Sequence, residues 1–403
     1  MITLPYDDCF GCGGCYNICP KQAITMTPDK YGYVHPVIDE QKCIECHMCE
    51  NVCTVHHPQP LHQPINVWAA VAKKNDLFQT VASGGLCSVM TEYFLSGGGV
   101  VYGCGELNYR DIRHIRIDKL EDAGLLKNSK YVHSDMNDAM KSVKKDLIDG
   151  RKVLFIGTPC QISGLYGYLH KNYDNLTTID LVCHGVPSQQ MLRDQIEMYR
   201  KSDIQDFENG FVQFRWKTRY GIRFGIRFGI RENLIKEELS DQNAYMSAFL
   251  SGISYRENCY SCPFATSERV SDITAADFWG LGNKTWAADK MIPSRFIDDN
   301  GVSLVIINTI KGKAMFEAVE NRFELEEHTI EEATLNNCNL SHPSPCLPTR
   351  QKFLHTYVTK GIRAAAKASI PNYRRNTNPI LRAIKSSKAA RSIYRALKNL
   401  NQR

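Results

Sequence analysis

The sequence predicts a small α+β unit over residues 1–58, an α/β unit over residues 65–350 and a basic, helical tail over residues 361–403. Three observations support this division. Eight cysteines crowd into the first unit, short apolar runs alternate with helical patterns in the second, and the third contains no acidic residue. The chain has 403 residues, which is more than one hydrophobic core usually serves.

The chain contains 16 cysteines, and their setting favours reduced thiols over disulfides. Met1–Cys9 has neither the basic segment nor the apolar run of a secretory signal. No window reaches about 18 apolar residues, the length that a membrane-spanning helix needs. We therefore expect a cytoplasmic protein, at most peripheral at the inner membrane surface, whose cysteines bind metal.

The first unit contains one cysteine spacing twice. The spacing C-x2-C-x2-C-x3-C is typical of bacterial ferredoxins with two 4Fe-4S clusters, where the fourth cysteine of each run serves the other cluster. We therefore expect a crossed assignment. One cluster is assigned to Cys9, Cys12, Cys15 and Cys53, and the other to Cys43, Cys46, Cys49 and Cys19.

Glycines between these cysteines support the same interpretation. Gly11, Gly13 and Gly14 allow the backbone to approach a cluster closely and to donate N–H groups to its sulfur atoms. The alternative is a pair of zinc knuckles, but four-cysteine zinc sites usually leave a longer gap between two pairs. One departure exists, since Thr54 stands where the first run has Pro20.

The second unit follows a linker, His56–Pro60, and alternates strands with helices. Buried strands are predicted at Lys152–Gly157 and at Leu176–Val182, and such alternation is typical of an α/β sheet with parallel strands. A short repeat, Gly221–Phe228, alternates apolar and basic residues and predicts a half-buried strand.

Several motifs of this unit belong together. They are Ser83-Gly84-Gly85, Ser129-Lys130-Tyr131-Val132, Val153 to Gln161, Cys183 to Ser188, and Tyr255 to Cys262 followed by Asp277-Phe278-Trp279-Gly280. With these motifs the unit resembles a known family, the beta subunits of coenzyme F-420 (deazaflavin) hydrogenases and dehydrogenases. The resemblance implies FAD in the α/β unit, a third 4Fe-4S cluster beside it and a coenzyme that exchanges hydride with the flavin.

The ligands expected for the third cluster are Cys160, Cys183, Cys259 and Cys262. Cys160 and Cys183 each follow a predicted strand, where ligands gather in open α/β sheets. Two alternatives stay open. The first two cysteines suit buried, inert thiols as well, and the pair at 259 and 262 suits zinc shared with His342, Cys338 or Cys346.

The residues expected to contact the flavin lie in motifs that are less specific than the cysteine spacings. Ser83, Gly84 and Gly85 precede a helical pattern, which places backbone donors for phosphate at a helix N-terminus, although a plain N-cap has the same residues. Further charge or hydrogen bonds are expected from Lys127, Ser129, Lys130 and Tyr131, with solvated surface residues as the alternative.

No acid-base motif appears in the sequence, so one histidine is the candidate for proton delivery. His184 follows Cys183 directly, and imidazole titrates near neutral pH. The alternative is a structural histidine. Flavin and cluster chemistry does not require a protein base, but His184 is the expected catalytic residue if a proton is delivered.

The tail holds 11 Lys or Arg, so the rest of the chain has 38 basic and 43 acidic side chains. Its aliphatic residues recur at helical spacing, which predicts a basic amphipathic helix that contacts a membrane surface or a partner. A helix packed on the body, or a solvated tail, is the alternative. No nucleic acid is expected, because no second basic patch with aromatic residues is present. The stripe is Ile380, Leu381, Ile384, Ile393, Leu397 and Leu400.

Two functional classes remain open from the sequence. In the first, the chain is an iron-sulfur flavoprotein oxidoreductase that passes electrons between its clusters and a coenzyme or small substrate. In the second, it is an electron-transfer subunit that serves a partner enzyme. A zinc-bearing interaction module is a distant third. The expected partner is a redox protein or a reduced coenzyme.

Overall fold

The computed structural model describes residues 4–73, 80–218, 221–282, 288, 290–297, 301–371 and 373. The six aliphatic residues of the tail stripe lie outside these ranges. Within them, no helix is both long enough and apolar enough to cross a membrane.

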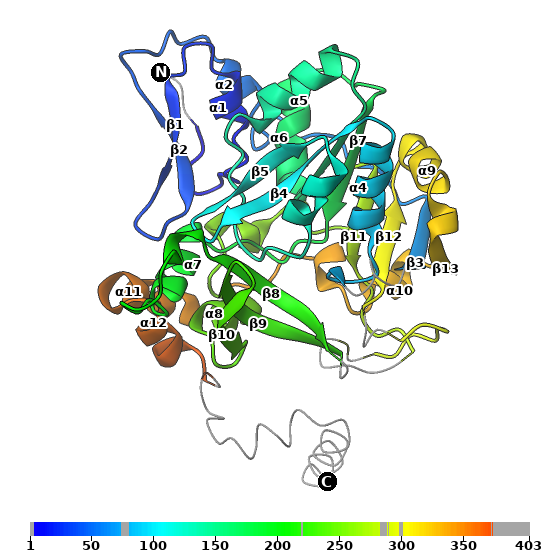
Figure 1. The fold of residues 1–403 in the computed structure, drawn as a ribbon. Coiled ribbons are helices and arrows are strands. Elements are labelled where there is room, and N and C mark those ends of the chain that lie inside the picture. The colour runs from blue at the N-terminus through cyan, green and yellow to red at the C-terminus, as the bar shows by residue number, and fades with distance from the viewer. Residues whose placement is uncertain are drawn as a thin grey trace.

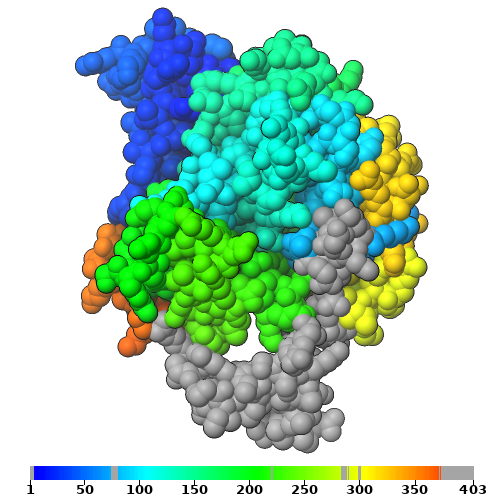
Figure 2. Space-filling model, in the orientation of Figure 1, coloured from blue at the N-terminus to red at the C-terminus, as the bar shows by residue number. Residues whose placement is uncertain are grey.

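The N-terminal unit is a small α+β structure, as expected, and forms a separate lobe along one side of the molecule (Figures 1 and 2). Its two strands pair antiparallel, with Ile24 opposite Ile38. Each cysteine run leads into a short helix whose N-cap residue, Gly13 or His47, has a positive φ. The elements are α1 Gly14–Ile18, β1 Ile24–Pro28, β2 Val34–Ile38 and α2 Met48–Asn51.

The large unit is built on an eight-stranded mixed sheet, with strands in the order β13-β3-β12-β11-β7-β6-β4-β5. The prediction of parallel strands is confirmed for the four central strands and wrong for the outer ones, which pair antiparallel. The central strands are β4 Val100–Asn108, β6 Val153–Gly157, β7 Leu176–Leu181 and β11 Ile273–Asp277. The outer strands are β3 Asn66–Ala72, β5 Asp111–Ile117, β12 Ser303–Ile307 and β13 Phe323–His328.

Helices cover both faces of this sheet because its strands are apolar on both faces. Val153 and Phe155 of β6 pack on one side with α5 and α6, while Leu154 packs on the other side with α4 and α9. Each side therefore has its own core. The helices are α4 Leu86–Ser96, α5 Ala139–Ile148, α6 Pro159–Leu169 and α9 Ile310–Glu317, with the short α10 Ile330–Thr334 further along.

A second, three-stranded antiparallel sheet packs beside the first, in the order β10-β9-β8. The predicted strand at Gly221–Phe228 is confirmed, since it lies within β9. The start of the expected tail also belongs to the body, because Ile362, Ala365 and Ala366 of α12 are buried in the core of this region. The elements are β8 Phe211–Thr218, β9 Gly221–Ile230, β10 Asn233–Leu239, α7 Gln189–Glu197, α8 Ala244–Leu250, α11 Thr349–Lys360 and α12 Ile362–Ser369.

Short 3-10 helices complete the described structure. One of them, Glu257–Ser261, carries Cys259 and is named η3. The others are Leu120–Leu126, Phe207–Asn209, Glu320–Arg322 and Cys338–Leu340.

Candidate iron-sulfur and cofactor sites

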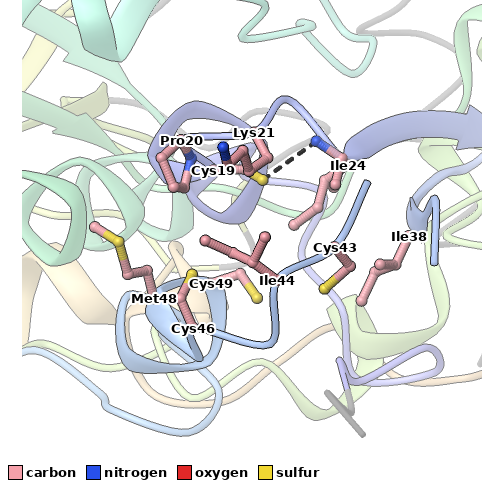
Figure 3. Close-up of a pocket in the computed structure, with 11 residues that line it drawn as sticks. Cys19, Pro20, Lys21, Ile24, Ile38, Cys43, Ile44, Cys46, Met48 and Cys49 are labelled. Atoms are coloured by element: carbon pink, nitrogen blue, oxygen red, sulfur yellow. Dashed lines mark hydrogen bonds between the residues drawn. The ribbon is translucent and has the colours of Figure 1, made fainter. Parts of the chain in front are cut away.

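Four cysteines line one pocket of the N-terminal lobe (Figure 3). Cys19 follows α1, and the others lie in or just before α2. The backbone N–H of Ala23 donates a hydrogen bond to the Cys19 sulfur at 3.3 Å, and Cys46 is exposed. Ile24, Ile38, Ile44 and Met48 also line the pocket. We call this group, Cys19, Cys43, Cys46 and Cys49, the outer set.

Four other cysteines line a second pocket of the same lobe. The backbone N–H of Gly11 donates to the Cys9 sulfur at 3.3 Å. Burial raises the pKa of the Cys12 thiol to about 12, and the neighbouring Cys9 and Cys53 act in the same direction. We call Cys9, Cys12, Cys15 and Cys53 the inner set.

The two sets have the crossed composition expected from the spacing, because Cys19 and Cys53 each lie with the other run's three cysteines. Four thiols around one pocket, with backbone N–H groups directed at sulfur, suit a 4Fe-4S cluster. The left-handed conformation of Gly11 and Gly13, with φ of 65° and 75°, turns the backbone tightly within the inner run.

The four later cysteines also come together, although about a hundred residues separate the first from the last. Cys160 begins α6 directly after β6, Cys183 follows β7, and Cys259 and Cys262 lie in and just after η3. Burial raises the pKa of Cys183 to about 11 and of Cys259 to about 12, and the thiols of this group raise each other's values. We call Cys160, Cys183, Cys259 and Cys262 the third set.

A buried ion pair holds two parts of the third set in place. Arg269 contacts Asp180 at 3.1 Å, with side-chain exposures of 1% and 0%. The same guanidinium donates to the carbonyl of Phe264, two residues after Cys262, and to the carbonyl of Leu181, two residues before Cys183. The pair therefore ties the η3 segment to the end of β7.

The zinc alternative places one ion between the later cysteines and a histidine. Among the residues that the structure describes, no three His, Cys, Asp or Glu side chains are grouped to hold one metal ion. Cys338 and Cys346 are exposed, and the His342 ring contacts the carbonyl of Pro343. A four-iron cluster has a different geometry, because each thiolate binds a separate iron.

The Ser83-Gly84-Gly85 segment lies at the N-terminus of α4, as expected, but the structure explains its glycines by packing. A β-carbon at Gly84 would collide with the carbonyl oxygen of Ala70, and one at Gly85 would lie 3.1 Å from the β-carbon of Ala72. Gly85 also caps α4 with φ of 101°. Packing against β3 is thus a sufficient reason for glycine at position 84, and the expected approach of its backbone to phosphate stays a prediction.

The residues expected at Lys127 to Tyr131 divide into two groups. Lys127 donates to the Thr80 hydroxyl at 3.2 Å, and Lys130 donates to the carbonyls of Leu125 and Lys127, so both ammonium groups contact neighbouring turns. Ser129 lies in the same segment and hydrogen-bonds the Tyr131 side chain. Two of them interact with more distant segments, since the Tyr131 ring stacks on Phe249 at 4.8 Å and the Lys130 charge interacts with Cys104 and Glu106 of β4.

An ion pair without a predicted role lies at the centre of this region. Arg215 of β8 binds Asp277, at the end of β11, through two bonds of 2.6 and 3.1 Å, and its side chain is 2% exposed. Its Nη1 also lies 3.4 Å from the Tyr131 hydroxyl, while its Nε is buried without a hydrogen-bond partner.

Two further residues lie near the same pair, Lys217, which the sequence analysis missed, and the expected His184. Lys217 donates to the carbonyl of Ser83 at 2.9 Å, and burial, with the charge of Arg215, lowers its pKa to about 7. Although His184 is exposed, partial desolvation by its neighbours lowers its pKa, and Asp277 acts on it in the opposite direction. We call Arg215, Lys217, Asp277, Tyr131 and His184 the strand-end group. The alternation of Arg215 and Lys217 along one face of β8 is the sequence signal that could have indicated the two cations.

Comparisons with known proteins match both units of the chain. Residues 150–333 match the family described as the C terminus of the beta subunit of coenzyme F420 hydrogenase/dehydrogenase, and residues 8–56 match the 4Fe-4S dicluster domain. The first match includes the whole third set. The motifs at Ser83–Gly85 and Ser129–Tyr131 lie outside it.

Two curated proteins of Methanocaldococcus jannaschii are similar to short parts of the chain. An uncharacterized polyferredoxin-like protein is 40% identical over 55 residues, which are 12% of this chain and 33% of that protein. An uncharacterized ferredoxin is 35% identical over 52 residues, which are 13% of this chain and 66% of that protein. The chain therefore spans about a third of the first relative's length.

One solved structure is similar over most of the chain. It is a chain of the xenon-derivatized F420-reducing NiFe hydrogenase complex from Methanosarcina barkeri, with 16% identity and a TM-score of 0.44 over 76% of this chain and 91% of that chain.

The family expected from the motifs is thus confirmed, together with the iron-sulfur character of the N-terminal lobe. The chain thus joins a region similar to the beta subunit of coenzyme F420 hydrogenase/dehydrogenase, an oxidoreductase family, at residues 150–333, to a region similar to the 4Fe-4S dicluster domain at residues 8–56.

Proposed function

We propose that this chain carries single electrons through three 4Fe-4S clusters, held by the outer, inner and third sets, to a two-electron site at the strand-end group. One observation carries the proposal. Helix α6 begins at the third set with Cys160, and one turn later its Gly164 packs against Cys12 of the inner set. Four residues of helix correspond to about 6 Å along its axis.

The exposure of the cysteines supports an order for the three sets. Cys46 of the outer set is exposed, whereas Cys9 of the inner set is buried and Cys12 lies against α6. Electrons are therefore exchanged with a redox partner protein at the outer set and pass inward to the third set. The strand-end group follows, because Cys183 and His184 are adjacent and His184 lies near Asp277.

The strand-end group has the chemistry to hold FAD. Arg215 has a buried Nε without a partner, Lys217 adds a second cation, and the Tyr131 and Phe224 rings lie beside the guanidinium. Cations suit a pyrophosphate and aromatic rings suit a flat ring system. A bound flavin supplies the exchange between single electrons and a hydride.

The roles of individual residues follow from their positions. Arg215 and Lys217 bind the anionic part of the cofactor, Tyr131 packs on its ring, and Lys127, Ser129 and Lys130 shape the adjoining turn. His184 delivers a proton at the same site, where its exposed ring can exchange protons with solvent. The substrate class is a deazaflavin-type coenzyme or a small molecule that accepts a hydride.

A second candidate function is an electron-transfer subunit without a substrate of its own. The bonds of Arg215 to Asp277 favour it, because this guanidinium is 2% exposed and is already engaged by a carboxylate of the protein itself. In this case the third set exchanges electrons directly with a partner enzyme.

The experiment that separates the two candidates is anaerobic reconstitution of the full chain with iron, sulfide and FAD. The oxidoreductase proposal expects about twelve irons and about one flavin per chain, with the flavin lost in Lys217→Met and kept in Lys127→Met. Stoichiometric iron with no flavin would favour the electron-relay function. About eight irons would remove the third cluster from either proposal.

The basic tail and the cellular location complete the proposal. We place the chain in the cytoplasm, where thiols stay reduced, with the tail beyond residue 373 touching an anionic membrane surface. Each Lys or Arg near such a surface contributes about 1 kcal/mol. Binding to anionic vesicles at low salt, lost on removal of residues 374–403, tests this placement.

A further inference from the structure

Arg256 lies between the inner set and the third set and contacts the segments that carry both. Its Nε donates to the carbonyl oxygen of Cys9 at 2.5 Å, and its Nη2 donates to the carbonyl of Val34. On the other side, the backbone N–H of Cys259 donates to the carbonyl of Arg256 at 3.1 Å. The residue as a whole is 2% exposed.

These contacts make a short chain of bonds between two expected cluster ligands. It runs from the Cys9 carbonyl through the guanidinium and backbone of Arg256 to the Cys259 amide. The backbone N–H of Arg256 also donates to the carbonyl of Val186, three residues after Cys183. One residue therefore joins the N-terminal lobe to both loops of the third set.

The guanidinium also lies close to the loop of the inner set. A β-carbon at Gly11 would be 3.2 Å from Arg256 Nη1 and 3.1 Å from the His133 ring. The charge of Arg256 interacts with the Cys12 thiol and with the Cys259 thiol. One positive charge thus acts on thiols of two sets.

We propose that Arg256 is the positioning residue for electron transfer between the inner and third clusters: it holds the two sets together, and its charge favours the reduced form of each cluster. The inference rests on the proposed function, since it requires a cluster at each set. In each transfer one electron leaves the inner set and arrives at the third set. Arg256 keeps its protons and its charge.

The physical reason is the placement of a fixed cation in a buried region. An added electron makes a cluster more negative, so a nearby cation stabilises the reduced cluster and raises its reduction potential. Arginine suits this position because its planar group donates along two directions at once and stays charged when buried. Lysine keeps the charge but not the paired contacts to Cys9 and Val34.

The test compares Arg256→Met and Arg256→Lys with the unmodified chain, all reconstituted anaerobically. Redox titration followed by paramagnetic resonance gives the potential of each cluster, and stopped-flow reduction gives the transfer rate. Arg256→Met should lower the potentials of the inner and third clusters, leave the outer cluster unchanged and slow transfer to the third cluster at least tenfold. Arg256→Lys should restore the potentials but not the full rate.

A matched control is Arg350→Met, because Arg350 is also 2% exposed but donates to the carbonyl of Tyr255 and pairs with Glu257, and no hydrogen bond joins it to a cysteine run among the described residues. It should leave the inner potential unchanged. Unchanged inner and third potentials in Arg256→Met would overturn the charge role, and a full transfer rate in Arg256→Lys would overturn the positioning role. If Arg256→Met loses iron, the potentials and the transfer rate of Arg256→Lys test the two roles. About eight irons in the unmodified chain would instead contradict the proposed function.

Discussion

The sulfur of Cys12 lies against Gly164, one turn into α6, so closely that a β-carbon at position 164 would be 2.7 Å from it. Gly167 of the same helix packs on the backbone of Val52, and Ser163 hydrogen-bonds Thr54. The face of α6 that follows Cys160 is therefore shaped to receive the inner set. One helix therefore carries a cysteine of the third set, Cys160, and packs against a cysteine of the inner set, Cys12.

Gly164→Ala should damage the inner cluster even though alanine favours helix by about 1 kcal/mol over glycine. The added methyl group displaces the Cys12 sulfur, so we expect loss of about four irons and of the inner paramagnetic signal. Gly124→Ala is the control, since a β-carbon at 124 meets nothing within 4 Å. Full iron content in Gly164→Ala would show that the sulfur moves without losing its iron.

The crossed assignment predicts which cluster each fourth cysteine serves. Cys19→Ser should impair the outer cluster and Cys53→Ser the inner one, because these residues line the outer and inner pockets respectively. Paramagnetic spectra of the reduced variants distinguish the two clusters. The opposite pattern of loss would reverse the assignment.

The third set predicts about twelve irons in the intact chain and about eight after Cys262→Ser. The eight ferredoxin-type cysteines lie in the N-terminal lobe, so their clusters should persist. Cys346→Ser is a suitable control, because Cys346 is an exposed thiol outside the set. Equal iron in Cys262→Ser and the unmodified chain would remove Cys262 from the ligands.

Asp180→Asn should destabilise the fold by about 3–5 kcal/mol, because it leaves the buried Arg269 charge without its partner. The affected contacts hold the η3 segment on β7, so third-cluster content should fall as well. Asp118→Asn, which weakens an ion pair with Arg116 whose side chains are 33% and 38% exposed, should cost no more than about 1 kcal/mol. Thermal unfolding measures both, and equal melting temperatures would contradict the prediction.

FAD binding should weaken as the pH rises, if Lys217 binds its phosphates. Burial lowers the pKa of Lys217 to about 7 in the free protein, so the ammonium form that attracts an anion is lost above that pH. The dissociation constant, measured by fluorescence titration, should increase between about pH 6 and about pH 8, a window of about one unit on either side of this pKa. Lys217→Met should bind weakly with little dependence on pH.

The local spacing of the cysteines was enough to predict both sets of the N-terminal lobe. Each run folds into one tight loop, so the positions of three ligands depend on a few neighbouring backbone angles. The strands at Val153–Gly157 and Leu176–Leu181 were equally visible, because strands buried on both faces are continuously apolar.

Other features depended on contacts between distant segments. The third set becomes a group because β6, β7 and β11 are neighbours in the sheet and Arg269 ties η3 to the end of β7. The pairing of Arg215 with Asp277 and the reach of Arg256 to Cys9 have no local pattern, since their partners are 62 and 247 residues away. Gly84 is a further example. Its sequence suggested a ligand, and only the packing of β3 and β12 reveals that a side chain at this position would collide with backbone atoms. The short-range spacing of the cysteines therefore predicted the ferredoxin ligands. The third set and the contacts of Arg215 and Arg256 depend on tertiary packing, because it alone brings segments distant in the sequence together.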